Sequence, residues 1–170
     1  MTLATTYAGL KAGAGGSWHA LITAAGSARP LVDDDADRVV HGYSVQKLAV
    51  AVAVLDEVDR GRLTLARKLD LPADLVLGGS GIYHLQTVWG DRITVAGALT
   101  AMLLVSDNTA VRLCGTVVPA RAINSALAAK GFTHTRVEPV DDPHRFLLGT
   151  TTPRETHDLL RRLADGTLLS

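Results

Sequence analysis

The sequence predicts an α+β fold in which an N-terminal strand hairpin precedes a series of helices. Residues 18–25 and 30–33 are rich in strand formers and flank a short turn, a pattern that indicates a hairpin. Residues 44–60 contain neither Pro nor Gly and are apolar almost all round as far as Leu55, which is typical of a helix buried in a core. Further helical patterns occupy most of the second half of the chain.

The composition indicates one globular domain over 1–170 that recognises its partners locally. The chain has 170 residues, 47% of them apolar, which is enough to bury a core. Lys and Arg total 17, as do Asp and Glu, so no net charge attracts the chain to nucleic acid or to an anionic membrane. Cys114 is the single cysteine, which excludes an internal disulfide, and its apolar surroundings at 111–118 predict a buried, inert thiol.

The sequence predicts no membrane span and no cofactor. Residues 1–16 carry one basic side chain and no continuous apolar block, so we expect a cytoplasmic protein as the chain is written, or a secreted or periplasmic one if its N-terminus was trimmed. The longest apolar run, 48–55, is far shorter than the roughly 20 residues that span a bilayer. The histidines form no His-x-x-x-His pair and the glycines at 13–16 complete no dinucleotide fingerprint, so we expect neither metal nor cofactor.

The order of the other elements follows from helix caps, glycines and changes of periodicity. Thr152, Pro153 and Glu155 supply an N-cap, a proline at the first helical position and a glutamate at the third, so they predict the start of the last helix. The expected elements are a helix over 3–12, an irregular connection over 70–90, helices over 94–105, 109–118 and 119–130, a loop over 132–149 and a last helix ending near Ala164.

Ser44 and Lys47 form the first candidate chemical motif. A serine hydroxyl is a weak nucleophile unless a base takes its proton, and a lysine becomes such a base when burial and neighbouring charge lower its pKa. Three residues apart on a helix, the two side chains share one face. The N-terminus of that helix adds backbone donors and positive potential, which favour an anion beside the serine.

A second motif, Ser106-Asp107-Asn108, lies downstream between two apolar helices. Together with Ser44-Val45-Gln46-Lys47 it resembles the first two signature motifs of class A β-lactamases and penicillin-binding proteins. Supporting segments that resemble the family are 63–65, 79–82 and 150–154, and the likeness extends over roughly 18–170. The chain is therefore identified as similar to the β-lactamase and DD-peptidase fold.

This resemblance implies a division of the domain and a set of residue roles. A helix and a hairpin at 1–43 would belong to an incomplete antiparallel sheet subdomain, and 44–170 would form the helical subdomain. Ser44 would be acylated by a β-lactam or by a D-Ala-D-Ala-like carbonyl, and its backbone N–H would supply half of an oxyanion hole. Lys47 would take part in proton transfer, and Ser106 would relay a proton to the leaving nitrogen.

Three further residues have roles that the resemblance leaves less defined. Asn108 would hold the substrate amide and contact Lys47, whereas Asp107 would hold the loop. Tyr83 would either line the mouth of the substrate pocket or be an ordinary loop aromatic. Both readings of Tyr83 remain open at this point.

Glu138 decides between two activities on this fold. β-Lactamases use a loop glutamate to activate the water that hydrolyses the acyl-enzyme, and the related DD-peptidases lack it. Glu138-Pro139 resembles the pair that carries that glutamate, but it follows Thr135-Arg136 too closely, so Glu138 would be either the deacylating base or a structural salt-bridge partner. Asp141 and Asp142 are weaker candidates for the base.

The family's third motif, Lys-Thr-Gly, does not occur in this chain. The resemblance therefore implies a C-terminal fragment or second chain that completes the fold, because the hairpin near Trp18 would otherwise keep an exposed edge. Three functions remain: a β-lactamase-like hydrolase, a DD-peptidase or esterase-like protein with slow deacylation, and a non-catalytic member of the fold. The first is favoured, with a β-lactam or D-Ala-D-Ala-like substrate and with no nucleic acid or membrane partner.

Overall fold

The computed structural model describes residues 2–27, 29–85, 91–138 and 148–170. It confirms the α+β class, with six α-helices and three small antiparallel sheets in that part of the chain. The helices are α1 (Leu3–Ala14), α2 (Gln46–Asp59), α3 (Val95–Leu104), α4 (Asn108–Val117), α5 (Ala120–Ala129) and α6 (Pro153–Ala164). The strands are β1 (Ala20–Ile22), β2 (Val32–Asp34), β3 (Val40–His41), β4 (Lys68–Asp70), β5 (Arg92–Thr94), β6 (Arg136–Glu138) and β7 (Leu148–Thr151).

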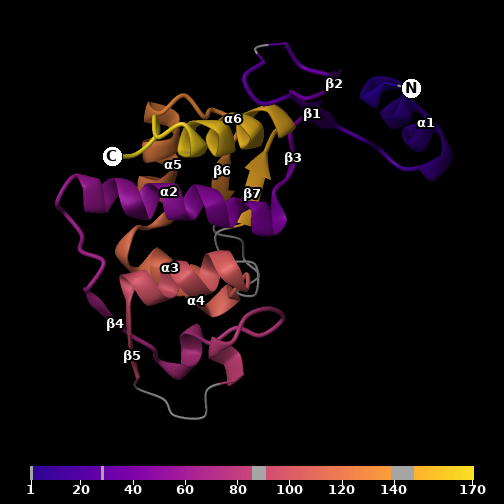
Figure 1. The fold of residues 1–170 in the computed structure, drawn as a ribbon. Coiled ribbons are helices and arrows are strands. Elements are labelled where there is room, and N and C mark those ends of the chain that lie inside the picture. The colour runs from indigo at the N-terminus through magenta and orange to yellow at the C-terminus, as the bar shows by residue number, and fades with distance from the viewer. Residues whose placement is uncertain (1, 28, 86–90, 139–147) are drawn as a thin grey trace.

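α2 is the central element of the fold. Its side chains from 49 to 54 are all buried, and it packs against α3, α4 and α5 and against β6 and β7. In Figure 1 it crosses the middle of the molecule, with α5 and α6 on one side and α3 and α4 on the other. A helix that is apolar almost all round is stable only when it is covered in this way, so α2 joins the two halves of the core.

The core also contains the single cysteine. Cys114 lies on α4 and is buried, as expected, and burial raises the pKa of its thiol to about 12, which keeps it protonated. Among the helices within the described ranges, none has the length and apolar character needed to cross a membrane.

The prediction of a loop over 132–149 is wrong in its described part. β6 pairs with β7, with Arg136 opposite Thr150 and Glu138 opposite Leu148, and β3 pairs with the other edge of β7. β4 and β5, which flank the irregular connection, also pair and were not predicted. These strands are two to four residues long and pair with distant segments, so no local alternation of apolar and polar residues predicts them.

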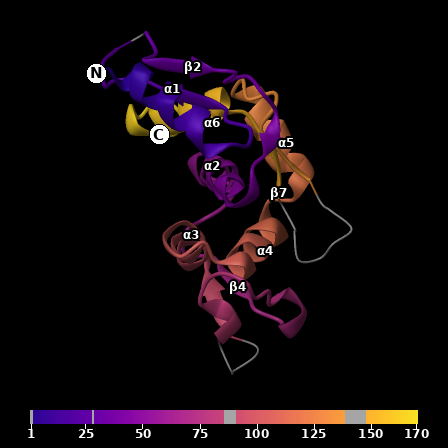
Figure 2. The same ribbon diagram turned by 90° about the vertical axis from the view of Figure 1, so that its right-hand side faces the viewer.

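The predicted N-terminal hairpin and first helix are confirmed. β1 pairs with β2, and α1 extends two residues beyond the expected end without burying any side chain. Polar contacts dock α1 on β2, because Tyr7 Oη and Lys11 Nζ lie 2.6 and 2.5 Å from the same Asp34 carboxylate oxygen. Figure 2 shows this unit at the end of the molecule opposite α3 and α4.

Gly149 provides a test of the β6–β7 pairing. A Cβ atom at this position would lie 2.0 Å from Arg136 O in the partner strand. We expect Gly149→Ala to lower the free energy of unfolding by about 1–3 kcal/mol, because the strands must separate to admit the methyl group. Gly9→Ala is the matched control, since no atom lies within 4 Å of its added Cβ and alanine favours a helix. Equal urea midpoints for the two variants would contradict the observed pairing.

Candidate active site

The candidate nucleophile lies in a tight turn between the three-stranded sheet and α2. Residues Tyr43–Val45 form a 3-10 turn, and α2 begins at Gln46, two residues after its predicted start. Tyr43 has a φ of 44°, a value that non-glycine residues seldom adopt. This bend leaves Ser44 exposed next to the helix N-terminus, whereas Lys47, less than one turn further along, is only 3% exposed.

Four of the predicted site residues meet at this turn. Lys47 Nζ lies 3.3 Å from Ser44 Oγ, 2.7 Å from Ser106 Oγ and 2.8 Å from Asn108 Oδ1. It also donates to the backbone carbonyl of Ser106 at 2.5 Å, and Ser106 Oγ donates to Ser44 Oγ at 3.1 Å. We call these four residues the serine–lysine cluster. It joins the start of α2 to the loop between α3 and α4.

The cluster favours the neutral form of its lysine. Burial lowers the pKa of Lys47 below its ordinary value, and the negative charge of Asp107 acts more weakly in the opposite direction. The hydrogen-bond partners of Nζ are uncharged oxygens, and within the described ranges no carboxylate forms an ion pair with it. Because burial disfavours its charged form, this amine is a better proton acceptor for a neighbouring hydroxyl than an exposed lysine is.

Asp107 builds the loop that carries the second motif. Its carboxylate is fully buried and accepts backbone N–H bonds from Ile82 and Tyr83 at 2.6 and 2.8 Å. The other carboxylate oxygen caps α4 by accepting from Ala110 N at 2.8 Å. The expectation that Asp107 holds the loop is therefore confirmed, and Ser106 is held beside it at a φ of 54°.

Asn108 links the cluster to a neighbouring loop. Its Oδ1 accepts from Lys47, the expected contact, while its Nδ2 donates to Gly78 O at 2.9 Å. Both ends of the amide are thus engaged, which fixes its orientation. The proposed role of Asn108 in holding a substrate amide stays a prediction.

Tyr83 and Glu138 lie outside the cluster. The half-buried Tyr83 donates its hydroxyl to Gly97 O at 3.1 Å, which ties it to α3. Glu138 ends β6 with an exposed side chain that forms no hydrogen bond or ion pair to another residue in the described ranges. Asp141 and Asp142 lie outside those ranges. The roles proposed for Tyr83 and Glu138 therefore stay predictions.

Gln46 was not singled out by sequence reasoning. It lies between Ser44 and Lys47 in the chain, is 1% exposed, and donates to backbone carbonyls of β6 and β7. The available signal was a polar residue at the start of a helix that is otherwise apolar to Leu55, since a buried polar group requires a partner.

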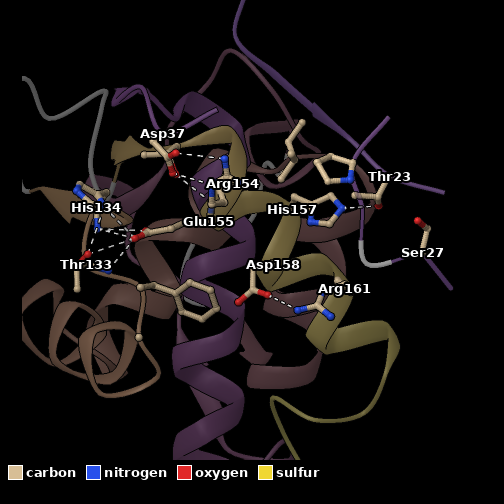
Figure 3. Close-up of a pocket in the computed structure, with 15 residues that line it drawn as sticks. Thr23, Ser27, Asp37, Thr133, His134, Arg154, Glu155, His157, Asp158 and Arg161 are labelled. Carbon is tan, nitrogen blue, oxygen red and sulfur yellow. Dashed lines mark hydrogen bonds and ion pairs between the residues drawn. The ribbon is translucent and has the colours of Figure 1, made fainter. Parts of the chain in front are cut away.

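A separate pocket of about 560 Å³ lies between the β1–β2 hairpin and α6 (Figure 3). No residue of the serine–lysine cluster lines it, and its polar groups bind one another. Arg154 donates to Asp37 at 2.7 Å, and Thr23 Oγ1 lies 2.8 Å from His157 Nε2. Glu155, the third residue of α6, accepts backbone N–H bonds from the loop before β6. Its carboxylate therefore holds that loop against the helix.

Comparisons with known proteins identify the family. The family model Beta-lactamase2, described as a β-lactamase enzyme family, matches residues 6–170. The chain belongs to the β-lactamase enzyme family. The resemblance drawn from the two motifs is thus confirmed at the level of the family, although no curated protein matches the chain significantly.

Solved structures of β-lactamases and of PBP-A share the fold of this chain. An ancestral class A β-lactamase, GNCA, is 27% identical with a TM-score of 0.84, and the match covers 99% of this chain and 66% of that one. The β-lactamase of Sphaerobacter thermophilus is 25% identical with a TM-score of 0.73, covering 82% and 53%. PBP-A is 26% identical with a TM-score of 0.74, covering 82% and 52%. This chain therefore spans about half to two thirds of the length of these structures.

Asp107 is expected to be essential for the stability of the site. In Asp107→Ala, α4 loses its cap and the backbone N–H groups of Ile82 and Tyr83 lose their acceptor, so the free energy of unfolding should fall by about 2–4 kcal/mol. Asp74→Ala, which changes an exposed aspartate, should stay within about 0.5 kcal/mol of the wild type. Urea denaturation followed by circular dichroism measures both, and a loss no larger than that of the control would refute the role of Asp107.

Proposed function

We propose that this chain carries the nucleophile and the base of a β-lactamase-like serine hydrolase that acts through an acyl-serine intermediate on a β-lactam or related amide. One observation carries the proposal: the buried Lys47 amine, with its lowered pKa, lies 3.3 Å from the exposed hydroxyl of Ser44. A nucleophile within hydrogen-bond reach of a lysine whose charged form is disfavoured by burial is the arrangement that lysine-assisted acyl transfer requires. Membership of the β-lactamase enzyme family supports the same reaction class.

In the proposed acylation, neutral Lys47 takes the proton of Ser44 as Oγ attacks the carbonyl carbon. The carbonyl π pair moves to the oxygen, where the backbone N–H of Ser44 supplies half of an oxyanion hole. The C–N bond then breaks, and the leaving nitrogen takes the proton of Ser106 Oγ. Lys47 then passes to Ser106 the proton that it took from Ser44. Asn108 holds the substrate amide meanwhile. The carbonyl re-forms as this bond breaks, and the net result is an acyl-serine and a neutral amine that carries the proton lost by Ser44.

The substrate class is inferred from relatives and from the chemistry of the cluster. A mutant of PBP-A forms an acyl-enzyme complex with penicillin G, and L2, which is 25% identical to this chain, is complexed with relebactam. We propose that this chain likewise takes a penicillin or a D-Ala-D-Ala-like amide. Each presents a carbonyl to Ser44 and a nitrogen to Ser106.

The alternative is a DD-peptidase or esterase-like protein with slow deacylation. The exposed position of Glu138 at the end of β6, without a hydrogen bond to the cluster within the described ranges, favours this alternative over rapid turnover. The similarity to PBP-A is compatible with it as well. The two enzymes share acylation and differ in the fate of the acyl-serine, whereas a non-catalytic member of the fold would form no adduct.

We also propose that a further segment completes the site with a Lys-Thr-Gly motif, either within a longer chain or as a second polypeptide. The chain spans 52–66% of three solved relatives. Among the described residues, β1 and β2 pair with each other and with no third strand, and a two-stranded hairpin is marginally stable by itself. The pocket between this hairpin and α6 offers space beside it.

Ser44 is tested by intact-mass measurement after incubation with penicillin G. We expect the wild-type protein, combined with a polypeptide that carries Lys-Thr-Gly, to gain the mass of the antibiotic, and Ser44→Ala to gain none. Ser80→Ala is the matched control, because Ser80 is a loop serine whose hydroxyl donates to Val105 O. If the completed protein shows neither a Ser44-dependent mass gain nor Ser44-dependent hydrolysis of penicillin G, both enzyme proposals are eliminated. Rapid turnover of a chromogenic cephalosporin then indicates a β-lactamase, and a long-lived adduct indicates the alternative.

The lowered pKa of Lys47 predicts how the acylation rate depends on pH. Because burial lowers its pKa, the neutral base becomes populated below the ordinary lysine range, and the acylation rate should rise with pH through this lowered pKa and then level off. Lys47→Arg, which stays charged, should acylate poorly at every pH. The rate of mass gain with penicillin G measures this profile. A rate that falls as pH rises across the same range would exclude Lys47 as the base.

A further inference from the structure

Gln46 is a buried amide directly behind the nucleophile turn. Side chains one and two positions apart on a helix do not face each other, so Gln46 points away from both Ser44 and Lys47. Its amide instead reaches the β3–β7–β6 sheet, where it is 1% exposed. The start of α2 therefore presents the serine–lysine cluster on one side and the Gln46 amide on the other.

The amide bridges two strands at one position of the sheet. Gln46 Nε2 donates to Arg136 O in β6 at 3.2 Å and to Thr150 O in β7, and these two residues are opposite each other in the strand pairing. A reversed amide would place Oε1 against both carbonyl oxygens, so the two strands determine its orientation. Oε1 is buried and accepts no hydrogen bond within the described ranges, so the donors alone hold the side chain.

The nucleophile turn is anchored to the sheet on both sides of Ser44. Before it, Gly42 N–H donates to Gly149 O at 2.8 Å, and Val45 N–H closes the turn by donating to Gly42 O at 2.9 Å. After it, Gln46 supplies the second anchor. A Cβ atom at Gly42 would lie 2.6 Å from Gln46 Nε2, so the glycine leaves the space that the amide occupies.

We propose that Gln46 is a positioning residue for acylation, whose amide fixes the Ser44 turn on β6 and β7 so that the Ser44 hydroxyl stays within reach of Lys47. The inference rests on the proposed function, because Gln46 acts only through Ser44. Without its donors, the carbonyls of Arg136 and Thr150 lose a partner and the turn, which includes Tyr43 at a φ of 44°, is free to move away from the sheet. A displacement of the nucleophile by roughly 1 Å lowers a rate by about 100-fold.

Gln46→Leu removes the donors while nearly keeping the volume. In the same completed protein used for Ser44→Ala, we expect its acylation by penicillin G to slow by about 10- to 100-fold, with little change in the penicillin concentration that gives the half-maximal rate. Asn124→Leu is the matched control. Asn124 also holds β6, through two 2.8 Å hydrogen bonds to the backbone of Val137, but it does not touch the Ser44 turn. Its loss should lower the thermal midpoint and leave the acylation rate unchanged.

Gln46→Glu gives a readout that a structural defect does not imitate. Only the protonated carboxyl can donate, and only to one of the two carbonyls, whereas the ionised form repels both. The ratio of variant to wild-type acylation rates should therefore rise as the pH is lowered, although protonation of Lys47 slows both proteins. The measurement is made where circular dichroism shows both to be folded, and it keeps the inference testable if Gln46→Leu does not fold.

The outcomes separate the two proposals. If the wild type shows neither a Ser44-dependent mass gain nor Ser44-dependent hydrolysis of penicillin G, the proposed function fails and the role of Gln46 fails with it. If the wild type is acylated at Ser44 while folded Gln46→Leu reacts at the wild-type rate, only the positioning role is overturned. A rate ratio for Gln46→Glu that does not vary with pH overturns it equally, and the proposed function stands.

Discussion

The burial of the Lys47 amine is the constraint on which the rest of the candidate site depends. An amine removed from water must find hydrogen-bond acceptors in the protein, and here the oxygens come from Ser44, Ser106 and Asn108. Ser106 lies in the loop between α3 and α4 and Asn108 is the first residue of α4, so that loop and the start of α4 must lie against the start of α2. Burial lowers the pKa of the amine, and within the described ranges no carboxylate forms an ion pair with it.

A polar loop can lie this close to the core because its own polar groups are satisfied. Asp107 is fully buried, but its carboxylate accepts three backbone N–H bonds from two segments. Gly81 allows the approach, since a Cβ atom there would lie 2.3 Å from the Asp107 carboxylate. On the opposite side of α2, Gln46 satisfies carbonyls of β6 and β7. The nucleophile therefore lies where the sheet, the central helix and the α3–α4 loop meet.

Sequence reasoning identified the groups of the cluster but not all of their supports. Ser44 and Lys47 were recognisable because their spacing places them on one face, and Ser106 and Asn108 because they form a second motif between apolar helices. Gln46 carried only a weak signal, since its partners are backbone carbonyls of strands that no local pattern predicted. The predicted start of α2 was two residues too early, because a 3-10 turn and the first turn of a helix look alike in sequence.

The sequence by itself determined the α+β class, the buried helix at the centre, the last helix with its cap at Thr152 and the four groups of the cluster. These features depend on periodicity, caps and motif spacing, which are local properties of the chain. Only the tertiary structure decided the pairing of β6 with β7, the anchoring of the nucleophile turn and the separation of Tyr83 and Glu138 from the cluster. Those features depend on contacts between segments far apart in the chain, where burial and backbone hydrogen bonding select the partner.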